Sequence, residues 1–226
     1  MELKRKILVI DVGGTHVKLL ATGQKVKREF ASGPKMGPVE MAGQVKDWVK
    51  DWDYDVISMG YPGPVVHGRP LREPHNLAAG WVRFDYKRAF DREVKIINDA
   101  AMQALGSYKK GRMLFLGLGT GLGSAMIVEG RLEPMELGHL PYRKGKTYED
   151  YLGLRGLERL GKKKWEHHVL KVVDEFRAAL VADEVVLGGG NSKRLTKLPL
   201  NTRLGNNENA FVGGFRMWDP KIGMGI

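Results

Sequence analysis

Two glycine-rich turns, each set between two apolar runs, constrain the fold of this chain more than any other feature of its sequence. The first turn, Gly13–Gly14, interrupts the run Ile7–Leu20, and the second, Gly119–Gly121, interrupts the run Met113–Gly130. The flanking residues are rich in Ile, Val and Leu, which is typical of buried strands. A single turn of this kind could be a plain hairpin. Two of them, roughly one domain apart in 226 residues, predict a duplicated fold whose halves face each other across a cleft.

Phosphate is the ligand that both turns predict. Glycine adopts backbone angles closed to other residues and leaves no side chain in the way, so successive N–H groups can face a bound anion. Asp11, at the end of the first strand, could not lie beside phosphate without a cation between them, and Mg²⁺ is the usual one. A plain hairpin would need neither Asp11 nor Thr15. The sequence therefore predicts an anion site with an indirect magnesium contact through Asp11.

The charge balance also favours an anionic partner. The chain carries a net charge of +11 and has a pI near 9.7, which indicates a polyanion or an anionic substrate. Basic residues gather in Lys162–Lys164 and again around Lys193–Arg194, although either run could be only the solvated face of a helix. The sequence has no zinc-finger spacing, no helix-turn-helix ahead of the first strand and no aromatic ribonucleoprotein motif. We therefore expect no nucleic-acid partner.

Cysteine content and apolar runs bear on the compartment. The chain has no cysteine, which excludes disulfides and thiolate metal sites and gives no support to secretion. No apolar run approaches the length of a membrane span, and the charged first residues lead straight into a strand. We expect a cytoplasmic protein without a membrane partner.

Hydrophobic spacing predicts further helices and strands between and after the turns. We expect helices over residues 38–52, 100–108, 147–160 and 163–180, and strands over 55–60, 94–97 and 184–187. The segment 66–83 has no period and should be a loop, either a wall of the substrate site or a plain surface connection. Gly188–Gly190 follows the last strand and would let a flat ring or a phosphate approach the backbone.

Asn98 and Asp99 follow a short apolar strand directly. Polar groups at the carboxyl end of a buried strand in an open α/β sheet project into the binding crevice. There Asp99 could accept a proton and Asn98 could hydrogen-bond a hydroxyl group. The alternative is that one of them only caps the helix that follows, which these residue types often do.

Six short motifs in one order carry a resemblance to a known family. They are Asp11-x-Gly13-Gly14-Thr15-x-x-Lys18, Tyr61-Pro62-Gly63, Asn98-Asp99, Gly117-x-Gly119-Thr120-Gly121-x-Gly123, Glu136-x-Gly138-His139 and Gly188-Gly189-Gly190. The ordered set resembles the sugar kinases of the ROK family (repressor, open reading frame, kinase). Stretches 140–151, 159–165 and 209–218 further resemble its polyphosphate glucokinase branch. The similarity covers nearly the whole chain.

The resemblance implies an α/β protein with two lobes of the actin-like, ribonuclease H-like fold. The N-terminal lobe would span residues 1–105 with the first turn, and the C-terminal lobe would span 106–207 with the second turn and the sugar motif. The segment from about 208 to 226 would pack back on the first lobe. We also expect a homodimer.

The same resemblance implies roles for individual residues. Asp99 would be the catalytic base. Sugar hydroxyls would be held by Asn76, Asn98, Asp99, Glu136 and His139. The phosphoryl donor and its nucleotide would be bound by Asp11, Gly13, Gly14, Thr15, Lys18, Gly119, Thr120, Gly121, Gly188, Gly189 and Gly190. A long polyphosphate would follow Lys144, Lys146, Lys162, Lys163 and Lys164.

Two departures from the family pattern matter. Most ROK kinases bind zinc through a cysteine cluster beyond the Glu-x-Gly-His motif, whereas this chain resembles the polyphosphate branch in having none. We therefore expect no zinc, and His139 should be a sugar contact or a structural residue. Many members have a further acidic residue after Asn-Asp-Ala, but this chain has Ala101, so the basic role rests on Asp99.

The predicted function is that of a glucokinase, which transfers a phosphoryl group from polyphosphate, ATP or both to the 6-hydroxyl of glucose with Mg²⁺ as cofactor. Three alternatives stay open: an ATP-only hexose kinase of the same fold, a ROK-type sugar-responsive regulator, and a silent sugar-binding protein. A regulator should carry a DNA-binding domain, yet this chain starts at the first turn. A silent binder should have lost Asp99 or the turn glycines, and the sequence retains both.

Overall fold

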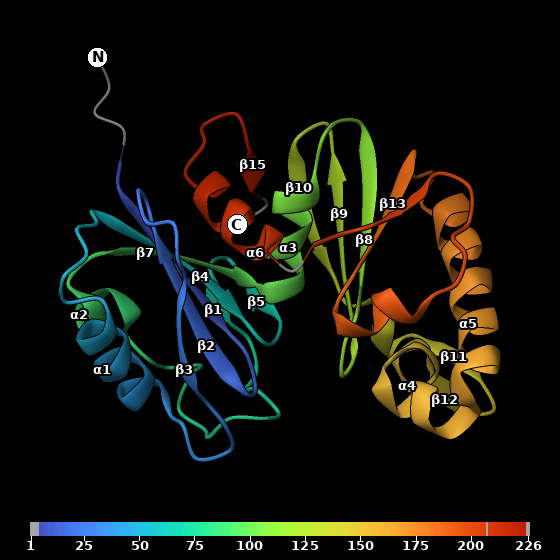
Figure 1. The fold of residues 1–226 in the computed structure, drawn as a ribbon, viewed down its shortest axis with the longest axis horizontal. Coiled ribbons are helices and arrows are strands. Elements are labelled where there is room, and N and C mark those ends of the chain that lie inside the picture. Colours follow the sequence, from blue (N-terminus) through green and yellow to red (C-terminus); the bar gives the residue numbers. More distant parts are fainter. Residues whose placement is uncertain (1–4, 207, 225–226) are drawn as a thin grey trace.

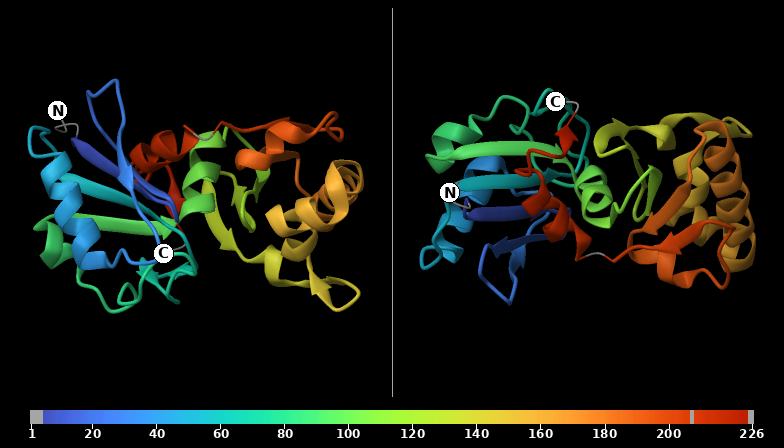
Figure 2. Two further views of the ribbon diagram at one scale, coloured as in Figure 1. Left: turned by 60° about the horizontal axis from the view of Figure 1, so that its bottom comes forward. Right: turned by 90° about the horizontal axis from the view of Figure 1, so that it is seen from above.

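The computed structural model describes residues 5–206 and 208–224. Its helices are α1 (Pro38–Trp48), α2 (Tyr86–Phe90), α3 (Asp99–Ser107), α4 (Tyr148–Leu152), α5 (Leu154–Ala179) and α6 (Asn209–Arg216). Helices α1 and α2 cover the outer face of one β-sheet, α3 and α6 lie between this sheet and a second one, and α4 and α5 cover the outer face of the second (Figure 1). Two further views show the same two lobes joined through α3 and α6 (Figure 2).

The two sheets repeat one arrangement. The first contains β1 (Ile7–Val12), β2 (His16–Ala21), β3 (Arg28–Ala31), β4 (Val56–Tyr61) and β7 (Glu93–Asn98), in the order β3-β2-β1-β4-β7. The second contains β8 (Arg112–Leu118), β9 (Leu122–Val128), β10 (Arg131–Met135), β13 (Glu184–Gly188), β14 (Thr202–Leu204) and β15 (Gly223–Met224), in the order β14-β13-β8-β9-β10-β15. In both, three antiparallel strands are followed by two parallel ones, and β15 is an addition. The predicted duplication is therefore confirmed.

Shorter elements complete the described chain. They are β5 (Val65–Val66), β6 (Arg69–Pro70), β11 (Pro141–Arg143), β12 (Lys146–Thr147) and the 3₁₀ helices η1 (Leu137–His139) and η2 (Gly190–Arg194). The loop predicted over 66–83 contains only Val66 of β5 and the two residues of β6 as regular structure. None of the helices in the described ranges is long and apolar enough to cross a membrane.

The central strand of each sheet contains four consecutive apolar residues, Ile7–Ile10 in β1 and Met113–Leu116 in β8, because both of its faces are covered. In β1, Leu8 and Ile10 pack in the core beneath α1 and α2, while Val9 packs in the core around α3 and α6. In β8, Phe115 faces the α3 and α6 core, while Leu116 faces the core beneath α5. Successive side chains of a strand point to opposite faces, so a fully covered strand needs apolar residues at both sets of positions.

Helices α3 and α6 approach each other at two glycines. A Cβ on Gly106 would lie 1.8 Å from the carbonyl oxygen of Asn209, and a Cβ on Gly213 would lie 1.8 Å from that of Met102. Neither position has room for a side chain, so the backbones of the two helices are in direct contact. This pair forms the layer that joins the two lobes.

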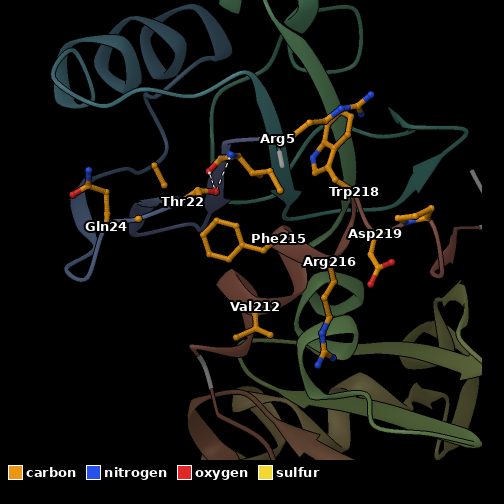
Figure 3. A pocket seen from close by; sticks show the side chains of 12 residues that line it. Arg5, Thr22, Gln24, Val212, Phe215, Arg216, Trp218 and Asp219 are labelled. Carbon is orange, nitrogen blue, oxygen red and sulfur yellow. Dashed lines mark hydrogen bonds between the residues drawn. The ribbon is translucent and has the colours of Figure 1, made fainter. Parts of the chain in front are cut away.

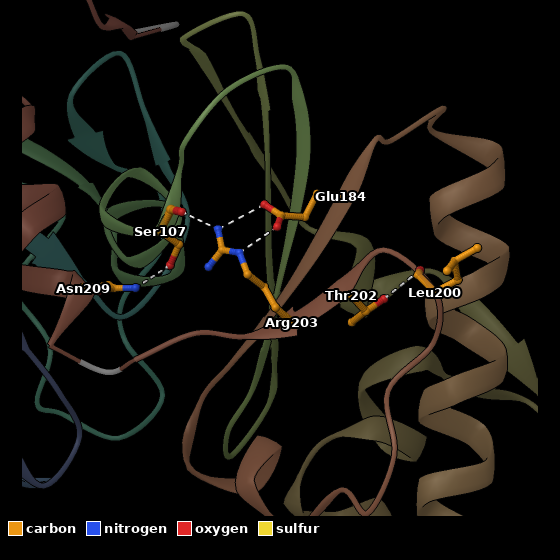
Figure 4. Close-up of polar contacts among 6 residues, drawn as sticks. All are labelled: Ser107, Glu184, Leu200, Thr202, Arg203 and Asn209. Atoms are coloured by element: carbon orange, nitrogen blue, oxygen red, sulfur yellow. Dashed lines mark hydrogen bonds and ion pairs between the residues drawn. The ribbon is translucent and has the colours of Figure 1, made fainter.

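An arginine ties the edge of the second sheet to the end of this helix pair (Figure 4). Arg203 on β14 donates to both oxygens of Glu184, at 2.7 and 3.0 Å, and to the carbonyl oxygen of Ser107 at 2.6 Å. The Oγ of Ser107 in turn accepts from Asn209 Nδ2 at 2.9 Å. A cation is favourable at this position because the last carbonyls of a helix carry partial negative charge.

Some helix ends differ from the prediction. The helix expected over 38–52 ends at Trp48. The division expected between the helices over 147–160 and 163–180 is confirmed at Gly161, and the first of the two is itself divided at Gly153, where α4 gives way to α5. Gly161 has φ 73° and ψ 158°, which interrupts α5 between the two expected segments. Glycine accounts for this break because it adopts positive φ without strain.

Candidate active site

The first glycine turn joins β1 to β2 and carries charges of its own. Asp11 on β1 pairs in register with Lys18 on β2, and Lys18 Nζ lies 3.8 Å from Asp11 Oδ2. Burial raises the pKa of the Asp11 carboxyl, and the charge of Lys18 opposes this shift. A Cβ on Gly14 would lie 2.9 Å from Asn76 Cβ, so the loop that carries Asn76 packs on the turn. The turn, its carboxylate and a predicted sugar contact thus lie together.

The second glycine turn joins β8 to β9 and lies against the start of α3. Gly119 donates its N–H to two carbonyls within the turn, at 3.1 and 3.2 Å. A Cβ on Gly123 would lie only 2.6 Å from Ala100 Cβ. Because Ala100 follows Asp99 in the chain, this close approach brings the second turn beside Asp99.

Asn98 and Asp99, at the junction of β7 and α3, have different surroundings. Asn98 is the N-cap of α3, since its Oδ1 accepts from the N–H groups of Ala100 and Ala101 at 2.9 and 3.2 Å. Its Nδ2 donates to the carbonyl oxygen of Gly63 at 3.1 Å. Asp99 is the first residue of the helix, and its Oδ1 accepts from Ala100 N at 2.8 Å. The N-cap position therefore belongs to Asn98 and not to Asp99.

The carboxyl group of Asp99 is half-buried among other acidic groups. Its pKa is raised to about 7, mostly by burial and then by the negative charges of Asp11 and Glu136, while the N–H of Ala100 opposes the shift. A general base works best when its pKa is close to the operating pH, because it then accepts a proton readily and is still ionised in a large fraction of molecules. Asp99 meets that requirement.

Glu136 and His139 lie at the two ends of η1. The Nδ1 of His139 is 3.6 Å from Oε2 of Glu136, and both side chains are about half exposed. Burial raises the pKa of Glu136, with the charge of Glu149 acting in the same direction, while His139 and Arg72 oppose the shift. Since Glu136 also acts on Asp99, η1 belongs to the same acidic site as the end of β7.

The triple glycine Gly188–Gly190 wraps onto the second turn. Gly189 has φ +79°, and a Cβ there would lie 2.5 Å from the backbone of Leu118. Asn191 then donates its Nδ2 to the carbonyl oxygen of Gly119 at 3.0 Å. Two glycine segments that are far apart in the sequence therefore form one surface.

The remaining predicted contacts are exposed. Thr15 and Thr120 lie on the surface of their turns. The lysines named for a polyphosphate path divide between two elements: Lys144 and Lys146 at the β11–β12 hairpin, and Lys162, Lys163 and Lys164 on α5 directly after its interruption.

Comparison with known proteins decides the family. The sequence matches the model of the ROK family over residues 7–145. The chain belongs to the ROK family. It is 29% identical over 214 residues to a polyphosphate glucokinase of Mycobacterium tuberculosis, in an alignment that covers 83% of this chain and 78% of that protein. The predicted resemblance is confirmed.

Solved structures of the ROK family share the two-lobed fold. The crystal structure of an inorganic polyphosphate/ATP-glucomannokinase from Arthrobacter sp. strain KM matches with a TM-score of 0.78 and 25% identity, over 94% of this chain and 98% of that one. A ROK family glucokinase from Streptomyces griseus matches with a TM-score of 0.73 and 15% identity, over 94% and 98% of the two chains. The predicted actin-like α/β fold is confirmed.

The acidic groups of this ROK protein are compatible with magnesium. In the described part of the chain, no three His, Asp or Glu side chains converge as a complete ligand set. Mg²⁺ in phosphate-handling sites usually takes one or two carboxylates, and phosphate oxygens and water fill the other positions. Asp11 offers such a carboxylate, and a nearby cation would relieve the repulsion between the charges of Asp11 and Asp99.

Glu149 lies at this site although the sequence analysis did not select it. Its Oε2 accepts from Leu122 N at 3.1 Å, and a Cβ on Gly121 would lie 2.2 Å from the same oxygen. Thr147 and Asp150 form a capping box that starts α4 and sets Glu149 in its first turn. That box is visible in the sequence as Thr-x-x-Asp. The contact of Glu149 with Leu122, which lies 27 residues earlier, is not visible in the sequence.

The cavity drawn in Figure 3 lies elsewhere. It encloses about 1110 Å³ and is lined by the start of β1, the turn after β2, and the end of α6 with the residues that follow, including Arg5, Thr22, Phe215 and Trp218. None of the predicted site residues lines it. The candidate active site is therefore distinct from this cavity.

Proposed function

We propose that this ROK protein is a glucokinase in which Asp99 accepts the proton of the sugar's 6-hydroxyl as its oxygen attacks the phosphoryl donor. The observation that carries the proposal is the setting of Asp99. Its half-buried carboxyl has a pKa near 7, one glycine turn supplies the neighbouring Asp11, and the other turn packs against the adjacent Ala100. General base catalysis of this kind typically contributes about 10²–10⁴-fold to the rate.

The acceptor would be held by polar groups from both lobes. Asn76, Asn98, Glu136 and His139 are the proposed sugar contacts. Asn98 is already fixed by its cap bonds and by Gly63, so it would present its remaining hydrogen-bonding capacity in one orientation. A sugar hydroxyl that is held rigidly near Asp99 loses little entropy on the way to the transition state.

The donor would be bound by the backbone N–H groups of the two turns, with Lys18 and Thr15 on one side and Thr120 and Gly188–Gly190 on the other. Phosphoryl transfer needs little covalent help, so alignment and neutralisation of the phosphate charge are the protein's main tasks. Mg²⁺, held by Asp11 through the donor phosphates, would supply part of that neutralisation.

Lobe closure would exclude water from the donor. We propose that residues 1–105 and 106–207 are the two lobes and that the segment from about 208 onward belongs with the first. Closure about the α3 and α6 layer would limit wasteful hydrolysis of the donor, as in other enzymes that close over a reactive phosphate.

We further propose polyphosphate as a donor, with ATP as a second one. The names of the relatives from Mycobacterium tuberculosis and Arthrobacter support this, as does the net charge of +11. An ATP-only hexose kinase is the competing assignment, because the two turns could satisfy the compact phosphates of ATP without any further cations.

A coupled assay for glucose 6-phosphate, run side by side with ATP and with long polyphosphate as the only donor, tests the proposal. We expect product from both donors, and no product from either when glucose is omitted. Activity with ATP alone would support the competing assignment. Absence of product with both donors would contradict a kinase function.

A further inference from the structure

Segment 188–197, between β13 and the side of α5, carries three cations. Lys193, Arg194 and Lys197 are exposed. Within the described residues, their charged groups form no ion pair with a carboxylate. In Figure 1 this segment, drawn in orange after β13, passes from the second sheet across to α5. Its position is fixed at both ends.

The inner end of this segment is attached to the second glycine turn. Gly189 lies against the backbone of Leu118, and Asn191 donates to the carbonyl oxygen of Gly119 at 3.0 Å. Lys193 and Arg194 complete the same 3₁₀ helix, η2, within three residues of that contact. A phosphate chain that starts at the second turn would therefore meet these two cations first.

The outer end is attached to α5 through Glu166. The buried carboxylate accepts from Thr196 N at 2.5 Å, from Thr196 Oγ1 at 2.8 Å and from Lys197 N at 3.3 Å. These bonds, led by that of Thr196 N, and the charge of Lys162 lower the pKa of Glu166. Lys162 and Lys163 precede Glu166 by four and three residues, so they lie on the same side of the helix.

The other lysines of the predicted path lie on the opposite side of α5. The β11–β12 hairpin that carries Lys144 and Lys146 is attached through Tyr142, whose hydroxyl lies 3.0 Å from His168 Nδ1. His168 follows Glu166 by two residues, which is more than half a turn around a helix. Lys164 lies four residues before His168 and shares its side.

We propose that Lys193, Arg194, Lys197, Lys162 and Lys163, and not Lys144, Lys146 or Lys164, bind the part of a long polyphosphate that extends beyond the second glycine turn. The five cations lie on η2, on the segment that follows it and on α5, and this segment is attached to the second turn at one end and to α5 at the other. ATP has only three phosphates before its nucleoside, which we place at Gly188–Gly190, whereas a polyphosphate with many units would continue past these glycines along the cations. Because the path matters only for a polyphosphate donor, it rests on the proposed function.

Two triple variants with equal change of charge test this path. In the path variant Lys193, Arg194 and Lys197 are replaced by Ala, and in the matched control Lys144, Lys146 and Lys164 are replaced by Ala. We expect the path variant to raise the KM for long polyphosphate about tenfold or more. Its KM for ATP and for tripolyphosphate should stay within about twofold. By analogy with single-stranded nucleic acid, losing three phosphate contacts should lower the slope of log affinity against log salt by about 2.

A double variant, Lys162→Ala with Lys163→Ala, tests the outer end independently and should raise the polyphosphate KM by a smaller factor. Equal effects of the two triple variants, or equal effects on ATP and long polyphosphate, would overturn the path while leaving the kinase assignment intact. A wild-type protein that uses ATP but not polyphosphate would overturn the donor assignment and the path together. These outcomes are distinguishable in one set of assays.

Discussion

The two glycine turns occupy equivalent positions in the two sheets but obtain their charged groups in different ways. The first turn has Asp11 and Lys18 within its own hairpin, seven residues apart and paired across the strands. The second has no charged residue in its two strands near the turn, and Glu149 of α4 supplies a carboxylate from 27 residues away. Loop 66–83 covers the first turn through Asn76, and η2 covers the second through Asn191.

This difference indicates a division of labour on one duplicated frame. We propose that the first turn binds phosphate through its backbone and the cation through Asp11, and that it also takes part in sugar binding through Asn76, which packs on it. The second turn is a neutral backbone surface, and the groups around it connect it outward to α4, α5 and η2. We therefore expect changes at the first turn to affect both substrates and changes at the second to affect mainly the donor.

Asp99 lies between the two turns, and its replacement should give the largest effect. Asp99→Asn keeps the shape but removes the base, so turnover should fall by about 10²–10⁴-fold while glucose binding survives in part. In the wild type, kcat/KM should rise with pH up to about 7, because the carboxyl must lose its proton to act as a base. Steady-state kinetics across pH check both, and near-normal turnover of the variant would contradict the role.

The same variant has a predictable effect on stability. Between the ordinary pKa of 3.8 and the folded value of about 7, folded Asp99 holds a proton that the unfolded chain has released. The free energy of unfolding of the wild type therefore falls as pH rises through this window. Asn does not titrate, so the variant does not lose this stability. Asp99→Asn should have a higher Tm than the wild type at pH 8 and nearly the same Tm at pH 4. Equal Tm differences at both pH values would argue against the raised pKa.

Replacing one glycine in each turn tests directly whether the two turns act on different substrates. Gly14→Ala would collide with Asn76 Cβ, and Gly121→Ala would displace the Glu149 carboxylate. Overpacking costs about 1–3 kcal/mol of folding stability, and the turn can relieve the collision only by shifting the backbone N–H groups that we propose to bind phosphate. We expect Gly14→Ala to raise KM for glucose and donor, and Gly121→Ala to raise mainly the donor KM. Gly43→Ala in α1, where a Cβ meets nothing within 4 Å, is the matched control and should leave both unchanged.

Glu136, the carboxylate proposed to bind the sugar, should give a smaller and more selective effect. Glu136→Gln replaces a charged acceptor by a neutral one, and hydrogen bonds to charged groups are stronger by about 1 kcal/mol. Glucose affinity measured by calorimetry should therefore fall about five- to tenfold, with little change in donor KM. Undiminished affinity would remove Glu136 from the sugar site. Glu149→Gln should instead act on the donor KM, since its partner is Leu122 N of the second turn.

The smallest effect concerns the loop that covers the first turn. Glu73 accepts from three consecutive backbone N–H groups, those of Gly80 at 3.0 Å, Trp81 at 2.9 Å and Val82 at 3.3 Å, and so joins the two ends of the segment that carries Asn76. Glu73→Gln puts a donor where an acceptor is needed. We expect the glucose KM to rise about three- to fivefold from a lost hydrogen bond of roughly 1 kcal/mol, with kcat and donor KM nearly unchanged.

Two companion variants make this last prediction specific. Glu73→Asp keeps the charge and should restore part of the glucose affinity. Glu93→Gln removes the same charge from an exposed residue at the start of β7 and should change nothing. A parallel loss of kcat and affinity for both substrates would indicate general destabilisation and contradict a positioning role.

The sequence by itself determined the parts of this protein that depend on local pattern. Apolar runs on both sides of Gly13–Gly14 and Gly119–Gly121 are enough to predict two buried hairpins, because a short apolar run bounded by turn residues is recognised within a few residues. The motif order was enough to indicate the ROK family and its fold. Asp11 and Lys18 could also be placed together from the sequence, since both belong to one hairpin.

Only the tertiary structure decided which groups meet at the site. Glu149 reaches Leu122 across 27 residues, and Asn191 reaches Gly119 across 72 residues. Sequence allowed either Asn98 or Asp99 to cap α3, and the geometry at the end of β7 gave the N-cap to Asn98. The tertiary structure also placed the lysines of the predicted polyphosphate path on two different sides of α5. Such contacts depend on how whole elements pack, and the packing of distant elements leaves no periodic signal in the chain.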